Sequence, residues 1–376
     1  MGRLSLLIAD KDETYIESMV NYLIVNHSVR FQVFSFTKQK YLQEFLERSD
    51  KQIDILLICP EFYTENLPFK KIRIPILLGS GKSVSNQREL DVVNRYQHVE
   101  KLIRDVTGIF AEKVQKEVYI SRGDKETKVV AVYSPVGGAG KTSVSLSASL
   151  QCALSGRRVL YVNLEDINST ALLFEKDGTK SFSKILYYLK EQSSNLSLKI
   201  EGSRCIDPRF NLHYFSPPQS CADMYELKPA DVTNLLQSLR NIGQYDVVFV
   251  DMDTRVDGKN MAALTASDEI FLIVTQEILP LAKAKSFINE LKVRFQRSEE
   301  ALHDKITLIL NKYNTNNSLK EEELHLGIKS PDIRIPDAAG MRSNFGVEYL
   351  VDSSNVFAIA VHQLIKKYLH DKETLN

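Results

Sequence analysis

Short apolar runs alternate with amphipathic stretches along most of the 376-residue chain. In the first part of the chain, apolar runs suited to buried strands fall at 4–10, 31–36, 53–59 and 72–79. Apolar residues at helical spacing predict helices at 13–26, 41–48 and 99–117. Because strands that alternate with helices form parallel sheets, residues 1–120 are predicted to be a doubly wound, flavodoxin-like domain.

The same alternation resumes after a polar, charged segment at 121–127, which is predicted to be a linker. Strands are predicted at 128–134, 158–163, 211–215, 246–251, 270–275 and 306–311. Helices are predicted at 141–154, 181–190, 229–242, 282–296 and 355–370. The polar stretches 191–204 and 314–325 are predicted to be loops or insertions. The fold class is therefore α/β, with a second doubly wound domain at 128–376.

Composition narrows the class of protein. Lys plus Arg and Asp plus Glu number 48 each, so net charge gives no support for a nucleic-acid partner. No apolar run approaches the ~18 residues that a membrane span requires, and acidic residues follow too soon for a signal peptide. The four cysteines form no C-x-x-C pair. We therefore expect a cytoplasmic protein without stable membrane insertion.

The strongest chemical signal is VVAVYSPVGGAGKTS at 129–143. A β-branched run enters a glycine-rich turn and a helix-compatible segment follows, which is the context of a phosphate-binding loop. The residues predicted to bind nucleotide here are Val136, Gly137, Gly138, Ala139, Gly140, Lys141, Thr142 and Ser143. Backbone N–H groups and the helix N-terminus attract phosphate. Lys141 is expected to contact the β- and γ-phosphates, and the Thr142 hydroxyl to ligate Mg²⁺.

A second strand ends in an acid. The sequence YDVVFVDMD at 245–253 places Asp251 at the carboxyl end of an apolar strand. Ligands of open α/β sheets bind beyond such ends. Asp251 is therefore predicted to hold Mg²⁺ through a water molecule, together with the hydroxyl of Thr142. Asp253 is either a second acid of the site or a solvent-facing residue.

A third strand, VLYVNLEDI at 159–167, ends in polar residues. Asn163 and Glu165 alternate and hence share one face of an extended chain. Either residue could orient an attacking water at the γ-phosphate, and Glu165 could also act through its charge. The residues predicted to carry catalysis are Lys141, Glu165 and Asp251.

The order of these motifs, followed by ILNKYN at 309–314 and IPDAAG at 335–340, resembles the deviant Walker-A ATPases of the ParA/MinD superfamily. The resemblance covers about 128–370 and implies a P-loop NTPase that uses ATP and Mg²⁺ and forms a homodimer. It places Ser143 at the α-phosphate and Asn311 at the adenine. It also places Ile335, Pro336 and Asp337 beside the base.

The sequence departs from that family directly before the paired glycines. The family's signature lysine, which reaches the phosphates of the partner subunit, is replaced by Val136. The aspartates usual on the second strand are replaced by Asn163 and Glu165. Because loss of a cation near the transferring phosphoryl group can cost about 10³-fold in rate, we expect ATP binding with slow or no hydrolysis.

The first domain, with LLIADKDE at 6–13, looks like a response-regulator receiver domain. Asp10 and Asp12 can stand for the acidic pair of a receiver. Cys59 occupies the place of the phospho-accepting aspartate, and no lysine is found around Tyr96 and Gln97, where one is expected. Cysteine cannot form the acyl phosphate. We therefore expect an atypical receiver that serves protein interaction or dimerisation.

An atypical receiver joined to a ParA/MinD-like ATPase is similar to the TadZ/CpaE group, which localises the machinery of Tad/Flp pilus assembly. The resemblance implies an ATP-dependent, dimerising localisation factor at a cell pole. Its implied partners are a homodimer mate and components of the pilus secretion system.

Two alternatives stay open, both of the ParA/MinD type. A partitioning ATPase that coats DNA would need a basic face, for which Arg334, Arg342, Lys366 and Lys367 are sparse. A membrane-associated ATPase would use a terminal amphipathic helix. The segment 356–369 is amphipathic, but we interpret it as a closing helix that packs on the sheet.

Overall fold

The computed structural model describes residues 3–64, 66–79, 90–114, 126–174, 181–193, 195–294, 302–315, 326, 333–337 and 346–369. The chain forms two compact units, described separately below. The first comprises residues 1–124 with 192–203, and the second comprises 125–191 with 204–376. Most of the predicted linker at 121–127 and of the predicted loop at 314–325 lies outside the described residues.

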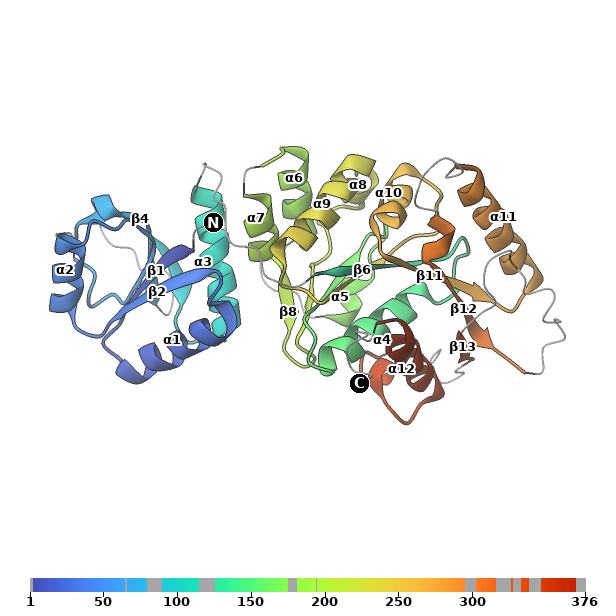
Figure 1. The fold of residues 1–376 in the computed structure, drawn as a ribbon, viewed down its shortest axis with the longest axis horizontal. Helices are drawn as coiled ribbons and strands as arrows, with labels where there is room; N and C mark the ends of the chain where they lie inside the picture. Colours follow the sequence, from blue (N-terminus) through green and yellow to red (C-terminus); the bar gives the residue numbers. More distant parts are fainter. Residues whose placement is uncertain are drawn as a thin grey trace. The chain divides into compact units, whose positions relative to one another are not determined.

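The first unit is built on a parallel sheet with the strand order β2-β1-β3-β4-β5 (Figure 1). Its strands are β1 (Leu4–Ala9), β2 (Phe31–Phe36), β3 (Ile53–Ile58), β4 (Ile72–Gly79) and β5 (Asp91–Asn94). Its helices are α1 (Glu13–His27), α2 (Gln39–Arg48), the 3-10 turn η1 (Phe69–Lys71), α3 (Val99–Lys113) and α7 (Leu196–Ser203). This order is that of flavodoxin-like sheets, and apolar clusters pack on the sheet from its helices.

Helix α7 corrects the prediction of a loop or insertion at 191–204. It packs against α3 at a glycine pair, where a Cβ on Gly202 would lie 2.5 Å from Cα of Gly108. Glu201 of α7 also forms a buried ion pair with Arg30. Because these contacts join residues far apart in sequence, local periodicity does not reveal the helix.

The second unit contains an eight-stranded sheet with the order β13-β12-β11-β6-β10-β7-β9-β8. Its strands are β6 (Lys128–Tyr133), β7 (Val159–Asn163), β8 (Cys205–Asp207), β9 (Leu212–Tyr214), β10 (Val247–Asp251), β11 (Glu269–Thr275), β12 (Ile306–Tyr313) and β13 (Ile333–Pro336). Only β8 runs antiparallel to its neighbour among the described strands. The five central strands are buried over most of their length, as in a sheet covered on both faces.

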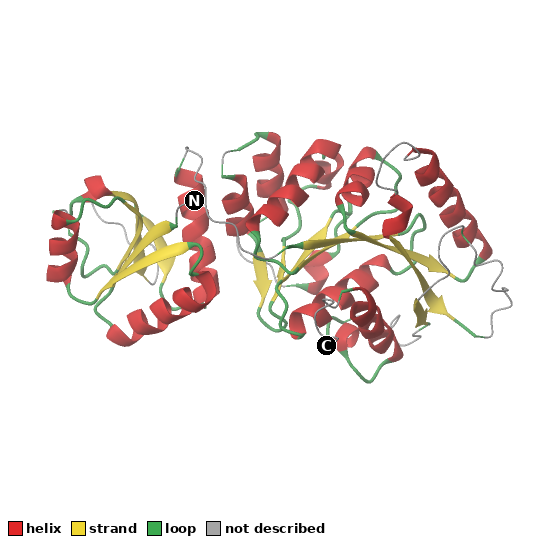
Figure 2. Ribbon diagram, viewed as in Figure 1, coloured by secondary structure: helices red, strands yellow, loops and turns green. Residues whose placement is uncertain are grey.

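Helices cover both faces of this sheet (Figure 2). They are α4 (Lys141–Leu154), α5 (Thr170–Leu173), α6 (Phe182–Lys190), α8 (Cys221–Tyr225), α9 (Pro229–Ile242), α10 (Gly258–Ala266), α11 (Ile278–Arg294) and α12 (Val356–Tyr368), with 3-10 turns η2 (Leu302–Lys305) and η5 (Tyr349–Val351). Helices α4 and α12 lie on one face and α9, α10 and α11 on the other (Figure 1). The apolar side of α12 is buried in the core cluster that also contains α4. The predicted packing of this last helix on the sheet is confirmed.

Several short elements were not predicted from the sequence, namely β5, β8, β13, α5, α8 and α10. None is longer than the nine residues of α10, so they contain too few apolar positions to show a period. Among the described residues, no helix is both long and apolar enough to cross a membrane.

Candidate functional site

The loop between β6 and α4 has the backbone of a phosphate-binding turn. Gly138 and Gly140 have φ angles of +71° and +96°, in the left-handed region that favours glycine. A Cβ on Gly140 would also lie 2.2 Å from Nδ2 of Asn311. Gly137 and Gly138 are exposed, whereas the neighbouring Ala139 is buried. Glycine at position 140 is therefore required by both conformation and space.

Helix α4 begins directly at this loop. Gly140 is its N-cap, and glycine has no side chain that could accept a hydrogen bond from the first N–H groups of the helix. Such groups, together with the positive end of the helix dipole, favour an anion. Lys141 is buried and Thr142 and Ser143 are half-buried in the first turn, while Val136 is half-buried in the loop. These features fit a phosphate group at residues 136–143.

Asp251 lies at the carboxyl end of β10, between β6 and β7. Its partners in register are Val132 on β6 and Asn163 on β7. The carboxyl group is fully buried, and its Oδ2 accepts a hydrogen bond of 2.8 Å from the hydroxyl of Tyr161. Its Oδ1 has no hydrogen-bond partner in the described part of the chain. A buried, half-satisfied carboxylate is costly unless a cation or a proton completes it.

The pKa of Asp251 shows which groups of the site act on its carboxyl group. Burial and, next, the Glu165 carboxylate raise the pKa of Asp251 to about 7, although Tyr161, Thr142 and Lys141 partly oppose the rise. Burial also raises the pKa of Glu165, against the effects of Asn163 and Lys141. These effects indicate that Lys141, Thr142, Glu165 and Asp251 act on one another within a single site.

This donor set fits Mg²⁺. Magnesium prefers oxygen ligands and is usually held by one or two protein groups together with substrate phosphates. The Thr142 hydroxyl and Oδ1 of Asp251 would supply those two groups. Among the described residues, no group of three or more His, Cys, Asp or Glu side chains forms a metal site of the all-protein kind.

Asn163 orients Glu165. The amide Nδ2 of Asn163 donates to Oε2 of Glu165 at 3.3 Å, and the backbone N–H of Glu165 donates to Oδ1 of Asn163 at 2.8 Å. Tyr161 and Asn163 belong to β7, and Glu165 lies two residues after its end. The sequence analysis did not identify Tyr161, although it alternates with Asn163 and Glu165 along the chain and that alternation could have revealed it.

Residues at the end of β12 donate hydrogen bonds to the loop between β6 and α4. Nδ2 of Asn311 donates to the carbonyl oxygen of Ala139 at 2.7 Å, and Nζ of Lys312 donates to that of Gly138 at 2.7 Å. The Asn311 side chain is buried in this arrangement. Its observed contact is therefore to the loop, and its contact to adenine remains a prediction.

The three residues expected beside the base lie at the end of β13. Ile335 is buried, Pro336 is half-buried and Asp337 is exposed. The N–H of Asp337 donates to the carbonyl oxygen of Tyr313 at 3.1 Å, which ties this segment to β12. Their role at the base remains a prediction.

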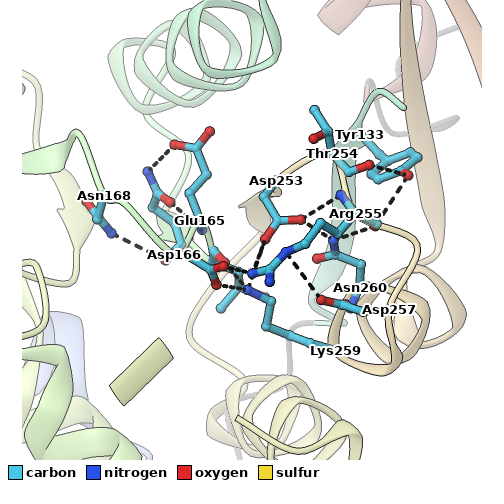
Figure 3. Close-up of polar contacts among 12 residues, drawn as sticks. Tyr133, Glu165, Asp166, Asn168, Asp253, Thr254, Arg255, Asp257, Lys259 and Asn260 are labelled. Atoms are coloured by element: carbon cyan, nitrogen blue, oxygen red, sulfur yellow. Dashed lines mark hydrogen bonds and ion pairs between the residues drawn. The ribbon is translucent and has the colours of Figure 1, made fainter. Parts of the chain in front are cut away.

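The sequence analysis also did not identify two basic residues near the site. Lys259 and Arg255 lie among Asp166, Asp253 and Asp257, between the loops that follow β7 and β10 (Figure 3). Their shared partner Asp166 is distant in sequence, 93 residues from Lys259, so no local motif marks the connection between the two loops.

The first unit holds its own buried acid. Asp10 is fully buried and lies 3.3 Å from the guanidinium of Arg95, which also pairs with Asp12 at 2.8 Å. The guanidinium stacks 4.6 Å from the ring centroid of Tyr15. Cys59 is buried, and burial raises the pKa of its thiol. The acidic pair Asp10 and Asp12 is thus paired with Arg95, which directly follows β5.

A mostly parallel sheet with this glycine-rich loop and this buried aspartate defines the second unit as a P-loop nucleotide-binding fold. Residues 127–306 match the model of a family described as "AAA domain". The septum site-determining protein MinD of Bacillus subtilis is 23% identical over 252 residues, which are 66% of this chain and 91% of that protein. MinD of Buchnera aphidicola is 20% identical over 255 residues, 65% of this chain and 91% of that protein.

Solved structures share the fold of the second unit. A ParA family ATPase from Chlorobium tepidum has a TM-score of 0.54 at 17% identity and covers 65% of this chain and 99% of its own. MinD from Pyrococcus horikoshii, complexed with Mg-ADP, has a TM-score of 0.51 at 20% identity and covers 64% and 95%. A plasmid partition protein from Borrelia burgdorferi, bound to AMPPNP, has a TM-score of 0.52 at 20% identity and covers 65% and 99%. The chain therefore contains the fold of ParA/MinD-like P-loop ATPases.

Proposed function

We propose that the second unit binds ATP with Mg²⁺ and acts as a nucleotide-dependent positioning protein of the ParA/MinD type. Residues 136–143 would surround the phosphates, with Lys141 at the β- and γ-phosphates. Thr142 and Asp251 would hold Mg²⁺, and Glu165 would face the attacking water. The observation that carries the proposal is the Oδ1 atom of Asp251, which is buried and has no hydrogen-bond partner in the described part of the chain. Lys141 and Thr142, in the first turn of α4, act on this carboxyl group.

The relatives support the choice of ligand. MinD from P. horikoshii was solved with Mg-ADP and the B. burgdorferi partition protein with AMPPNP. Magnesium, when bound, would neutralise the phosphates and the acidic groups around them. Lys141 would add a fixed positive charge. Val136 carries no charge, so hydrolysis is expected to be slow or silent.

A homodimer is part of the proposal. Large apolar side chains are exposed in the segments that follow β7 and β11. These segments leave the sheet at the carboxyl ends of its strands, as the loop at 136–143 does. The exposed side chains are Ile167, Leu172, Ile278 and Leu279. Exposed apolar groups on segments at the ligand-binding end of the sheet are suited to an interaction surface. A second copy of the chain would cover them.

The finer proposal is a TadZ/CpaE-type localisation factor for Tad/Flp pilus assembly at a cell pole. Its support is the joining of a ParA/MinD-like unit to a unit with the strand order 2-1-3-4-5, in which an acidic pair follows β1. Cys59 in the acceptor position favours an atypical receiver that binds other proteins. Pilus secretion components would then be its partners.

The first test is equilibrium binding of a fluorescent ATP analogue to the full chain with and without Mg²⁺. We expect Mg²⁺-dependent binding that Lys141→Ala weakens at least ~10-fold, because a charge-assisted contact to phosphate is lost. Lys190→Ala, which removes a surface lysine that pairs with Glu226 away from the loop, serves as the matched control. Absence of binding by the folded wild-type chain would overturn the proposal.

The second test distinguishes a dimerising localisation factor from a DNA-partitioning ATPase and from a membrane-associated one. Light scattering with and without ATP measures dimerisation, which should require nucleotide and fail in Lys141→Ala. Filter binding to DNA and flotation with liposomes should both be negative. ATP-dependent retention of DNA would favour a partitioning ATPase instead, and ATP-dependent flotation would favour a membrane-associated one.

A further inference from the structure

Two neighbouring loops of the second unit are joined by basic side chains. One loop follows β7 and carries Glu165, and the other follows β10 and carries Asp253 (Figure 3). These strands pair directly, with Asn163 opposite Asp251 at their carboxyl ends. A group that moves either loop therefore acts on the residues proposed for water and Mg²⁺.

Lys259 is the fixed part of this connection. Its Nζ atom donates to the carbonyl oxygen of Leu164 at 2.9 Å, to Asp166 at 2.7 Å and to Asp253 at 3.2 Å. The side chain is only 4% exposed. Its three ammonium protons thus have three partners. Removal of a buried ammonium group from two carboxylates is costly, so Lys259 is expected to keep its place.

Arg255 is the part of this connection that can leave its partners. Its guanidinium pairs with Asp166, with Asp253 at 3.3 Å and with Asp257 at 3.6 Å. The side chain is 41% exposed, ten times more than that of Lys259. The Asp166 and Asp253 side chains are less exposed, at 24% and 16%, but Lys259 pairs with both. The guanidinium itself remains in contact with water, so it can exchange one anionic partner for another. After release of Arg255, Asp166 and Asp253 would still be paired with Lys259.

We propose that Arg255 is the residue that distinguishes ATP from ADP: it leaves Asp166 and Asp253 and binds the terminal phosphate of ATP in the same chain. This inference rests on the proposed ATP site. An arginine suits this role because its planar fork binds phosphate oxygens through two parallel hydrogen bonds. It would supply, from the loop after β10, a positive charge that Val136 does not supply from the loop after β6.

The exchange has a consequence for the loops. When Arg255 turns to the phosphate, Lys259 is the one of these two basic residues that still joins the segment that contains Asp166 to Asp253. The loop after β7 then carries a less neutralised Asp166 and can rearrange around Glu165. ATP, but not ADP, would drive this change, because only ATP presents a terminal phosphate beyond the β position.

The experiment measures dissociation constants for ATP and ADP, each with Mg²⁺, by calorimetry on the full chain. Arg255→Ala is compared with wild type, with Arg255→Lys and with Arg294→Ala. Arg294 pairs with Glu290 on the surface of α11 and serves as the matched control. We expect Arg255→Ala to lower the ratio of the ADP to the ATP dissociation constant about 10- to 100-fold. The dissociation constant for ADP should stay within about twofold of the wild-type value. Arg255→Lys should retain part of the preference, and Arg294→Ala all of it.

The outcomes separate two kinds of failure. If wild type binds both nucleotides and Arg255→Ala leaves their ratio unchanged, this inference is wrong and the proposed ATP site stands. If wild type binds neither nucleotide, the proposed function is wrong and the inference falls with it. An equal loss of ATP and ADP binding would assign Arg255 a structural role and would also overturn the inference.

Discussion

The amide Nδ2 of Asn311 lies 2.7 Å from the carbonyl oxygen of Ala139, so the end of β12 holds the loop between β6 and α4 in place. Both groups are buried. Loss of one partner from a buried hydrogen bond leaves the other unsatisfied and costs about 1–3 kcal/mol. Asn311 therefore contributes to the loop before any base binds.

Asn311→Ala is expected to lower the free energy of unfolding by about 1–3 kcal/mol in the absence of nucleotide. Chemical denaturation followed by circular dichroism measures this change. If Asn311 also recognises adenine, the variant should in addition lose its preference for ATP over GTP in the binding assay. Unchanged stability would contradict the supporting role, and an unchanged ATP-to-GTP ratio would contradict the role at the base.

The pKa of Asp251 predicts how stability depends on pH. Its folded value of about 7 lies above the ordinary value of 3.8. Between these values the folded state keeps a proton that the unfolded state releases, so stability falls as pH rises from about 4 to 7. One such group contributes a slope of roughly 1.4 kcal/mol per pH unit over that interval.

Asp251→Asn removes this titration. The variant should gain stability relative to wild type as pH rises from 5 to 8, measured by guanidinium unfolding without Mg²⁺ or nucleotide. Mg²⁺ with ATP should flatten the curve of the wild-type chain, because a bound cation stabilises the carboxylate. Parallel pH curves for the two proteins would show that Asp251 does not titrate in this range.

Val136→Lys tests why hydrolysis is expected to be slow. A lysine at this position would add a cation that can reach the phosphates of a partner subunit in a nucleotide-bound dimer. Turnover should rise, by up to about 10³-fold if this charge is the missing element. The measurement is the single-turnover rate of phosphate release, at a protein concentration where light scattering shows a dimer. An unchanged rate would place the limit elsewhere, for example at Glu165.

The loop at 136–143 and the central strands could be predicted from sequence because their signals are local. A β-branched run, three glycines and a following helix lie within 25 residues of one another. The terminal helix α12 was predicted for the same reason, since its apolar residues repeat at helical spacing.

The cations could not be predicted in the same way. Lys259 is 93 residues from Asp166, and Arg95 is 83 residues from Asp12. Their pairing follows from the order of strands in each sheet, which brings the loops at the carboxyl ends together. Helix α7 is a similar case, since the close approach of Gly202 to Gly108 exists only in the folded unit.

Arg95→Ala tests the charge balance inside the first unit. Asp10 is fully buried, its Oδ2 atom has no hydrogen-bond partner among the described residues, and Arg95 lies 3.3 Å from its Oδ1 atom. Removal of one partner of a buried ion pair leaves an uncompensated charge and costs about 3–5 kcal/mol. The free energy of unfolding of the first unit should fall by about that amount at pH 7.

Thiol labelling can measure this change within the full chain. Cys59 is buried in the first unit, so its rate of alkylation, followed by mass spectrometry, reports the opening of that unit. Arg95→Ala should accelerate labelling of Cys59 and leave that of Cys152, buried in the second unit, unchanged. The double variant Asp10→Asn, Arg95→Ala should restore most of the protection, because the buried charge is gone. Equal labelling of Cys59 in wild type and Arg95→Ala would show that Arg95 does not stabilise the acidic pair.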